Sequence, residues 1–167
     1  PDGHRVRVGG WGPAFGDEAS ASSIARRAIA TALGALDSEQ DHPFGRALLE
    51  TAGVASDAPS VRRHEGLLDY LYGERATPGR HAAFAVEVAR LAGAGEGDAV
   101  TLLEDAGRKL ADLARTAAKR SGATVVARAG GVLDKNVRVR SAFERSCRGD
   151  GLEVRPGAWD PVEGALR

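Results

Sequence analysis

The sequence has little of several residue types, and each shortage argues against a class of protein. It has one cysteine in 167 residues, Cys147, which excludes an internal disulfide and any Cys-x-x-Cys site. No apolar run is long enough for a membrane span or for the core of a signal peptide. Basic and acidic residues number 23 each, so a formal net charge of zero offers no general attraction for nucleic acid or an acidic membrane. We therefore expect a cytoplasmic protein that binds neither nucleic acid nor membranes.

Methionine is absent altogether, even at the first position. The chain opens at Pro1 and stops at Arg167 inside a predicted helix. We expect a piece of a longer polypeptide, and removal of a short leader is the weaker alternative. With 43% hydrophobic and 28% charged residues, the chain has the composition of one globular domain or of one lobe of a larger protein.

Apolar residues recur every three or four positions over most of the chain, which predicts a series of amphipathic helices. In the longest helix, Asp98 is the predicted cap and Gly122 the predicted end. The expected helices cover residues 24–36, 41–53, 61–72, 81–92 and 98–122.

Shorter patterns predict strands at residues 4–8, 123–127 and 152–154. The second of these is nearly continuous in apolar residues, as in a strand buried on both faces. A helix ending at Cys147 should follow it, although residues 137–140 also alternate as a strand would. Pro161 would open a last helix. The tail is therefore β-α-β-α, which implies a parallel pair of strands and an α/β fold.

A glycine-rich segment, GGWGPAFGDEAS, occupies residues 9–20. In one interpretation Asp17 is the N-cap of the following helix and Glu18 complements its dipole. In the other, the glycines expose backbone N–H groups to a ligand. Trp11 and the Asp17 carboxylate would then suit a flat, polyhydroxylated ligand such as a sugar. The residues alone leave both interpretations open.

A second glycine pair, Gly130 and Gly131, follows a predicted strand and precedes a helix. Open α/β sheets bind ligands at such positions, and a plain connecting turn is the alternative. The four histidines lie in unrelated segments without metal-binding spacing, so we expect no metal site. We interpret Cys147 as a small buried hydrophobic residue rather than a nucleophile.

The segment at residues 9–20, followed by a helix, resembles the BadF/BadG/BcrA/BcrD ATPase family, and within it the N-acetylglucosamine kinases. Three further segments are similar in order and spacing: AGEGD at residues 94–98, VVARAGGVL at 125–133 and DPVEGAL at 160–166. The resemblance covers essentially the whole chain. It implies that residues 1–167 are the C-terminal lobe of an actin/hexokinase/Hsp70-like (ribonuclease H-like) ATPase fold, with a helix-rich insertion between strands.

The resemblance also implies roles for individual residues and an activity for the full-length protein. That activity is ATP-dependent phosphorylation of N-acetylglucosamine or a related amino sugar, a reaction of carbohydrate metabolism. A homodimer is compatible with this activity. The residues expected to contact the sugar are Gly10, Trp11, Gly12 and Asp17. The residues expected along the nucleotide are Gly93, Gly130, Gly131, Gly164 and Ala165.

The chain departs from the family pattern in two respects. The family's phosphate-binding loops and catalytic aspartate are missing and would precede Pro1. We therefore expect no catalytic residue and no metal ligand in this chain, Mg²⁺ held with ATP mainly by the missing lobe, and no activity from the fragment alone. Ala19 stands where the family usually has glycine.

Two alternatives remain within the same family. One is an ATPase activator of a CoA-ester reductase or dehydratase, which would hold an iron–sulfur cluster with cysteines at a dimer interface. The single Cys147 argues against it. The other is a non-catalytic regulatory relative, for which Ala19 and the missing lobe are the hints.

Overall fold

A computed structural model describes residues 5–12 and 15–157 of the chain. Within these residues the chain forms seven α-helices and two β-strands. In chain order they are α1 (Ala21–Asp37), α2 (Pro43–Ala52), α3 (Ser60–Tyr72), α4 (Pro78–Gly93), α5 (Gly97–Ser121), β1 (Val125–Arg128), α6 (Gly131–Lys135), α7 (Val137–Gly149) and β2 (Glu153–Pro156).

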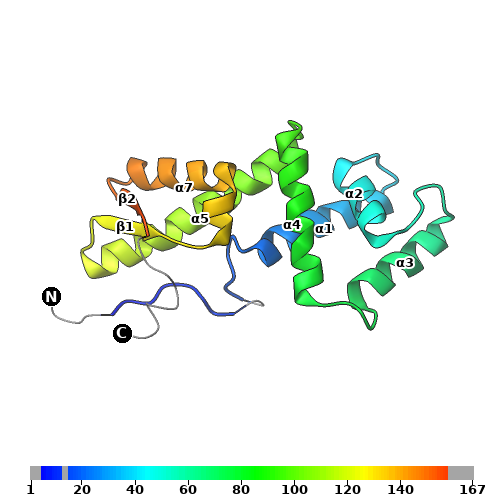
Figure 1. The fold of residues 1–167 in the computed structure, drawn as a ribbon, viewed down its shortest axis with the longest axis horizontal. Helices are drawn as coiled ribbons and strands as arrows, with labels where there is room; N and C mark the ends of the chain where they lie inside the picture. Colours follow the sequence, from blue (N-terminus) through cyan, green and yellow to red (C-terminus); the bar gives the residue numbers. More distant parts are fainter. Residues whose placement is uncertain (1–4, 13–14, 158–167) are drawn as a thin grey trace.

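The elements form two groups along an elongated molecule (Figure 1). Helices α1 to α4 make up one end, where α1 packs against α2 and α4 and where α3 lies outermost. At the other end, α5 packs against α7 and both strands lie beside them. Helix α5 connects the two groups because it also contacts α4 and α1.

One hydrophobic core runs through both groups and takes buried residues from each of the seven helices. Small side chains are prominent in it. In α1, the fully buried Ala25, Ala28 and Ala32 form one stripe at helical spacing. Such small side chains let neighbouring helices approach closely. Contacts between helices, rather than a large sheet, therefore form most of the core of the described residues.

The predicted helices are confirmed, and residues 137–149 are helical, which decides between helix and strand there. The predicted parallel pair is confirmed too: β1 runs parallel to β2, with Val126 opposite Val154. Helix α5 ends as predicted at Gly122, which adopts φ +73°. Pro161 and the last predicted helix lie outside the described residues.

Two strand predictions are wrong. Residues 5–8 belong to no strand, because no described strand lies beside them to complete a ladder. Strand β1 is not buried on both faces. Val126 and Arg128 are half-buried, whereas Val125 and Ala127 are exposed, so only one face of β1 is covered by the described residues.

Two predicted helix caps are wrong as well. The cap of α5 is Glu96, whose carboxylate accepts the N–H of Ala99 at 2.6 Å, while Asp98 lies in the first turn. Asp98 instead contacts His42 Nε2 at 2.9 Å. The cap of α1 is Ser20 and not Asp17. In each case two suitable oxygen-bearing side chains lie close together, and the local sequence does not rank them.

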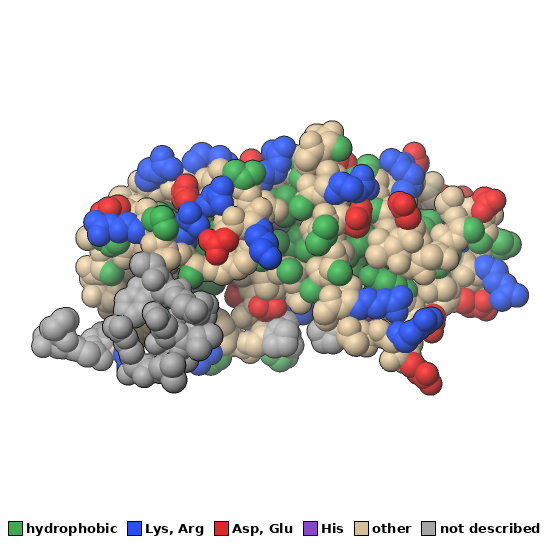
Figure 2. Space-filling view, in the orientation of Figure 1, with side chains coloured by type: hydrophobic (Ala, Val, Ile, Leu, Met, Phe, Trp, Pro, Cys, Tyr) green, Lys and Arg blue, Asp and Glu red, His purple; other side chains and the backbone are tan. Residues whose placement is uncertain are grey.

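Charges of both signs are interspersed over the face seen in Figure 2, including the arginine-rich surface of α7. Arg145 lies 3.5 Å from Glu104, and Arg148 lies 3.8 Å from Glu144. Arg145 and Arg148 are therefore accompanied by carboxylates, whereas Arg138 and Arg140 of the same helix donate to backbone carbonyls. None of the helices in the described part of the chain combines the length and the hydrophobicity that a membrane span requires.

Candidate functional site

The segment that leads into the glycine-rich loop lies alongside α5 (Figure 1). The Arg120 guanidinium donates to the backbone carbonyl of Arg7 at 3.1 Å. Arg7 in turn donates from its side chain to the carbonyl of Gly10 at 2.6 Å. Gly9 is buried, and a Cβ atom there would lie 3.2 Å from Leu113 Cδ1. Helix α5 therefore holds the start of the loop.

The loop needs its glycines for backbone reasons. Gly9, Gly10 and Gly12 have φ angles of +72°, +67° and +90°, in the left-handed region that favours glycine. Gly16 N–H donates to the Gly12 carbonyl at 2.9 Å, and a Cβ atom at Gly16 would lie 2.7 Å from the backbone nitrogen of Trp11. Gly16 thus packs against the backbone of Trp11 and Gly12 more closely than a residue with a side chain would allow.

Two aromatic side chains project from this turn. Trp11 is 76% exposed and Phe15 is 88% exposed. Large apolar side chains this accessible are available for contact with a ligand. The sequence predicted Trp11 as a sugar contact, and Phe15 is a neighbouring aromatic residue that it did not single out.

A β-turn connects the loop to α1. The N–H of Ser20 donates to the Asp17 carbonyl at 3.2 Å, and Ala19, the third residue of this turn, has φ +64°. A positive φ at this position is that of a type II turn, which favours glycine. Ala19 is only 4% exposed, so its methyl group is part of the core. This geometry explains why a glycine would suit position 19 and shows that the turn forms with alanine.

The Asp17 carboxylate lies outside the helix because Ser20 takes the cap position. Ser20 Oγ accepts the N–H of Ser23 at 3.0 Å and donates its hydroxyl hydrogen to Asp17 Oδ2 at 2.5 Å. The capping interpretation of Asp17 is therefore wrong. The interpretation of Asp17 as a ligand contact stays a prediction.

The second glycine pair lies at an open turn. Gly130 has φ +112° and precedes α6, and Gly131 is the first residue of that helix. A Cβ atom added at either position would meet no other atom within 4 Å. A flat ligand can approach the backbone closely here, so the residues present fit the nucleotide that the sequence predicts.

A cavity of about 460 Å³ lies between α4, α5 and the α6–α7 junction. Gly93 lines it, together with Lys135 and Asn136, which follow closely after Gly131 in the chain. Arg138 also lines the cavity and donates to the Ala92 carbonyl at 3.0 Å. The structure thus brings Gly93 to the segment that follows the second glycine pair, although Gly130 and Gly131 do not themselves line this cavity.

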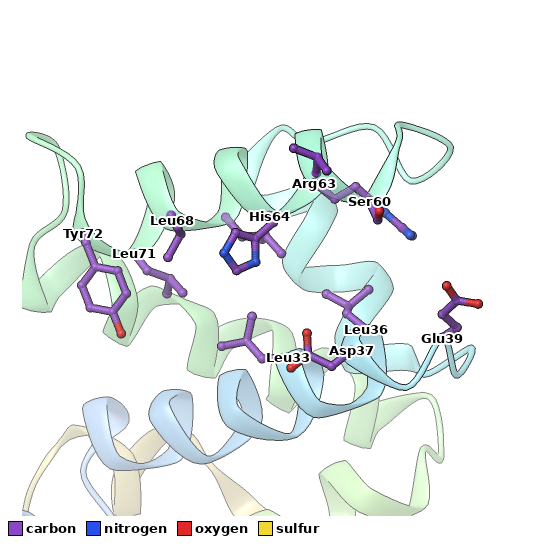
Figure 3. A pocket seen from close by; sticks show the side chains of 12 residues that line it. Leu33, Leu36, Asp37, Glu39, Ser60, Arg63, His64, Leu68, Leu71 and Tyr72 are labelled. Carbon is purple, nitrogen blue, oxygen red and sulfur yellow. The ribbon is translucent and has the colours of Figure 1, made fainter.

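A larger cavity of about 610 Å³ lies between α1 and α3, far along the chain from both glycine segments (Figure 3). Leucines from both helices form its apolar part, and Asp37, Glu39, Arg63 and His64 add charge and polarity. None of the predicted site residues that the structure describes lines it.

The structure leaves some predicted features apart. Among the described residues, no hydrogen bond or ion pair joins the loop at residues 9–17 to Gly130 or Gly131. Gly164 and Ala165 lie outside the described residues. No cluster of three or more histidine, cysteine, aspartate or glutamate side chains in the described part of the chain could hold a metal ion. Cys147 is fully buried, which confirms its interpretation as a small buried residue. This burial raises the pKa of its thiol.

Sequence reasoning missed three residues that shape the loop: Ser20, Arg7 and Arg120. Ser20 gave a signal, because it is a good cap residue one turn before Ile24, the first apolar helical residue, but Asp17 gave the same signal nearby. The two arginines gave no such signal. They meet across 113 positions of the chain, and no local pattern reports such a contact.

The described part of this chain is a helix-rich α/β structure with glycine turns at its loops, and its architecture is consistent with an ATPase of the actin-like type. The chain belongs to the BadF/BadG/BcrA/BcrD ATPase family, whose model matches residues 1–166. The family resemblance seen in the sequence is thereby confirmed.

A solved structure is also similar, that of a candidate N-acetylglucosamine kinase from Chromobacterium violaceum. The two chains are 30% identical, with a TM-score of 0.74. The match covers 99% of this chain and 52% of the other, so this chain spans about half the length of its structural neighbour. A comparison with curated proteins gave no match.

Proposed function

We propose that this chain is the C-terminal lobe of an ATP-dependent kinase for N-acetylglucosamine or a related amino sugar. In this proposal residues 1–167 supply part of the sugar site and one wall of the adenosine site. The family and the structural neighbour support a sugar kinase at this level. The particular sugar, the lobe assignment, the homodimer and the cytoplasmic location remain predictions.

One observation supports the sugar site most directly. The loop from Gly9 to Ser20 carries an exposed indole, that of Trp11, and the carboxylate of Asp17, which does not cap the helix. An exposed Trp11 offers an apolar face to the ring of a sugar. The Asp17 carboxylate can accept hydrogen bonds from sugar hydroxyls. The glycine turn brings Gly16, the residue before Asp17, directly against the backbone of Trp11.

Phosphoryl transfer depends mainly on positioning and electrostatic stabilisation. ATP, bound with Mg²⁺, supplies the phosphoryl group. The part of this chain is to bind the sugar at Trp11 and Asp17, to orient its acceptor hydroxyl, and to let the nucleotide lie against Gly130 and Gly131. Closure of a second lobe over the sugar would exclude water.

Two observations bear on the alternatives. An activator needs accessible cysteines for an iron–sulfur cluster, and Cys147 is fully buried. A non-catalytic relative was suggested by Ala19 and by the missing lobe; of these hints the structure addresses only Ala19, since the turn at residues 17–20 forms with alanine in place.

The proposal is tested with the complete protein that contains this chain. Incubated with ATP, Mg²⁺ and a panel of hexoses and N-acetylhexosamines, it should release ADP only with its substrate sugar. Release at the background level with every sugar would contradict the proposal.

Variants separate the two halves of the site. Trp11→Ala and Asp17→Asn should raise the KM for sugar and leave the KM for ATP nearly unchanged. Gly131→Val should do the reverse, because a Cβ atom at position 131 meets no described residue within 4 Å and the side chain would project into the space expected for the nucleotide. Equal effects of each variant on both KM values would count against the assignment.

A further inference from the structure

We propose that Ser20 is a positioning residue that orients the Asp17 carboxylate toward the sugar. This inference rests on the proposed function, because it assumes that Asp17 contacts the substrate. It goes further by assigning a role to a side chain that touches no ligand itself.

Ser20 makes four hydrogen bonds that join Asp17 to the start of α1. Its backbone N–H donates to the Asp17 carbonyl at 3.2 Å, and its hydroxyl donates to Asp17 Oδ2 at 2.5 Å. Its Oγ accepts the N–H of Ser23 at 3.0 Å, and its carbonyl accepts the N–H of Ile24 at 3.0 Å. The carboxylate is thus connected through one residue to the first turn of a helix.

The chemistry of a hydroxyl group allows both side-chain bonds at once. Serine has one hydrogen to donate and two lone pairs that accept. Because the Ser23 N–H occupies a lone pair, the hydroxyl hydrogen remains available for Asp17. A hydrogen bond to a charged carboxylate is shorter and stronger than one between neutral groups, in keeping with the 2.5 Å separation.

Buried residues anchor the chain on both sides of Ser20. Ile24 and Ala25 of α1 are buried, and so is Ala19 within the turn itself. Asp17 is only partly buried, and its Oδ1 has no hydrogen bond or ion pair to the described residues. Ser20 therefore engages one carboxylate oxygen and leaves the other available to a ligand.

Loss of the hydroxyl would let the carboxylate rotate. A sugar would then have to order it on binding, which weakens affinity by about three- to tenfold for one side chain. The effect should fall on sugar binding alone, since the nucleotide is expected at a different turn.

The test uses the complete protein, with titration calorimetry of N-acetylglucosamine and steady-state kinetics. Ser20→Ala should raise the Kd and KM for sugar about three- to tenfold and leave the KM for ATP within about twofold. Ser20→Thr keeps the hydroxyl and should restore values close to wild type. Ser20→Asp keeps a good helix cap, so it should fold, but it has no hydrogen to donate and should weaken sugar binding as Ser20→Ala does.

Thr77→Ala is the matched control. Thr77 caps α4 in the same way, by accepting the N–H of Arg80 at 3.1 Å, but it lies in another part of the chain. It should lower thermal stability about as much as Ser20→Ala and leave sugar affinity unchanged. If it weakens sugar binding equally, the effect of Ser20 is merely structural and the inference is overturned.

The two proposals fail in different ways. A wild-type protein that phosphorylates no amino sugar would overturn both. An active wild type whose Ser20→Ala and Ser20→Asp variants bind sugar normally would overturn only the role of Ser20.

Discussion

Gly107 of α5 lies directly against the backbone of Val139 in α7. A Cβ atom at position 107 would be 2.4 Å from the Val139 carbonyl oxygen, far inside normal contact. Both residues are buried where α5 packs against α7, the two helices that precede the strands β1 and β2. The absence of a side chain at position 107 therefore sets how closely α5 and α7 approach.

Gly107→Ala should lower the free energy of unfolding by about 1–3 kcal/mol, because the helices must separate to admit a methyl group. This loss should exceed the gain in helix propensity of about 1 kcal/mol. Gly34→Ala is the control: Gly34 lies exposed in α1, and a Cβ atom there meets nothing within 4 Å. It should stabilise the protein by up to about 1 kcal/mol in denaturant unfolding. A similar shift in both variants would contradict the packing argument.

The second prediction concerns Ala19, whose backbone lies in the left-handed region. Ala19→Val should destabilise the protein by at least about 2 kcal/mol, because a β-branched side chain is strained at φ +64° and the site is buried. Ala19→Gly should be nearly neutral. It relieves backbone strain of about 1–2 kcal/mol but loses a buried methyl group and adds chain entropy. Thermal unfolding distinguishes the two, and a tolerated valine would show that the turn relaxes easily.

The sequence predicted the helices well because each has one apolar stripe that a period of 3.6 residues reveals, as in Ala25, Ala28 and Ala32. The parallel strand pair followed from the change of period near Val125. Residues 5–8 show the limit of such patterns. Alternation describes which side chains share a face, but a strand also requires a partner, and the partner is not a local property.

For the candidate site, the sequence predicted which segments take part but not the conformation of those segments. Asp17 and Ser20 are both good cap residues, and only the hydrogen bonds of the folded turn decide between them. The contact of Arg120 with Arg7 is set by how the chain folds over 113 positions. The family pattern identified position 19 as unusual, and the positive φ of Ala19 supplies the physical reason.

Asp105 makes stability depend on pH. Its carboxylate lies 2.6 Å from Arg108 on the same helix and 3.0 Å from Arg27 on α1. Hydrogen bonding to Arg108 above all, and to Arg27, holds the pKa of Asp105 below its ordinary value. The contribution to stability is then fully present above the unfolded-state pKa of about 3.9 and is lost as the pH falls through the lower folded-state pKa.

Asp105→Asn should therefore lower the free energy of unfolding by about 0.5–1 kcal/mol at neutral pH, a modest value because the pair is partly exposed. The difference from wild type should shrink below about pH 4. Asp112→Asn, on the same helix, removes the more exposed pair with Arg115 and should have a smaller effect. Denaturant unfolding from pH 2.5 to 8 measures both. A difference that stays constant down to the lowest pH would exclude the ion pairs as its cause.

Tyr70 places its hydroxyl group inside the hydrophobic core. The side chain is 2% exposed, and its oxygen is buried without a hydrogen bond to the described residues. Burial raises the pKa of the phenol, against the opposing charge of Arg80, whose Cζ lies 4.6 Å from the ring centroid. An unsatisfied buried hydroxyl costs about 1–3 kcal/mol, so the ring stabilises the core while its oxygen opposes folding.

Tyr70→Phe should therefore raise the free energy of unfolding by about 1 kcal/mol. Tyr72→Phe is the control on the same helix, because Tyr72 is 79% exposed and its hydroxyl can bond to water in both states. That variant should be neutral in the same denaturant unfolding experiment. Destabilisation by Tyr70→Phe would mean that the hydroxyl is satisfied after all, and a buried water molecule would be the partner to look for in a crystal structure.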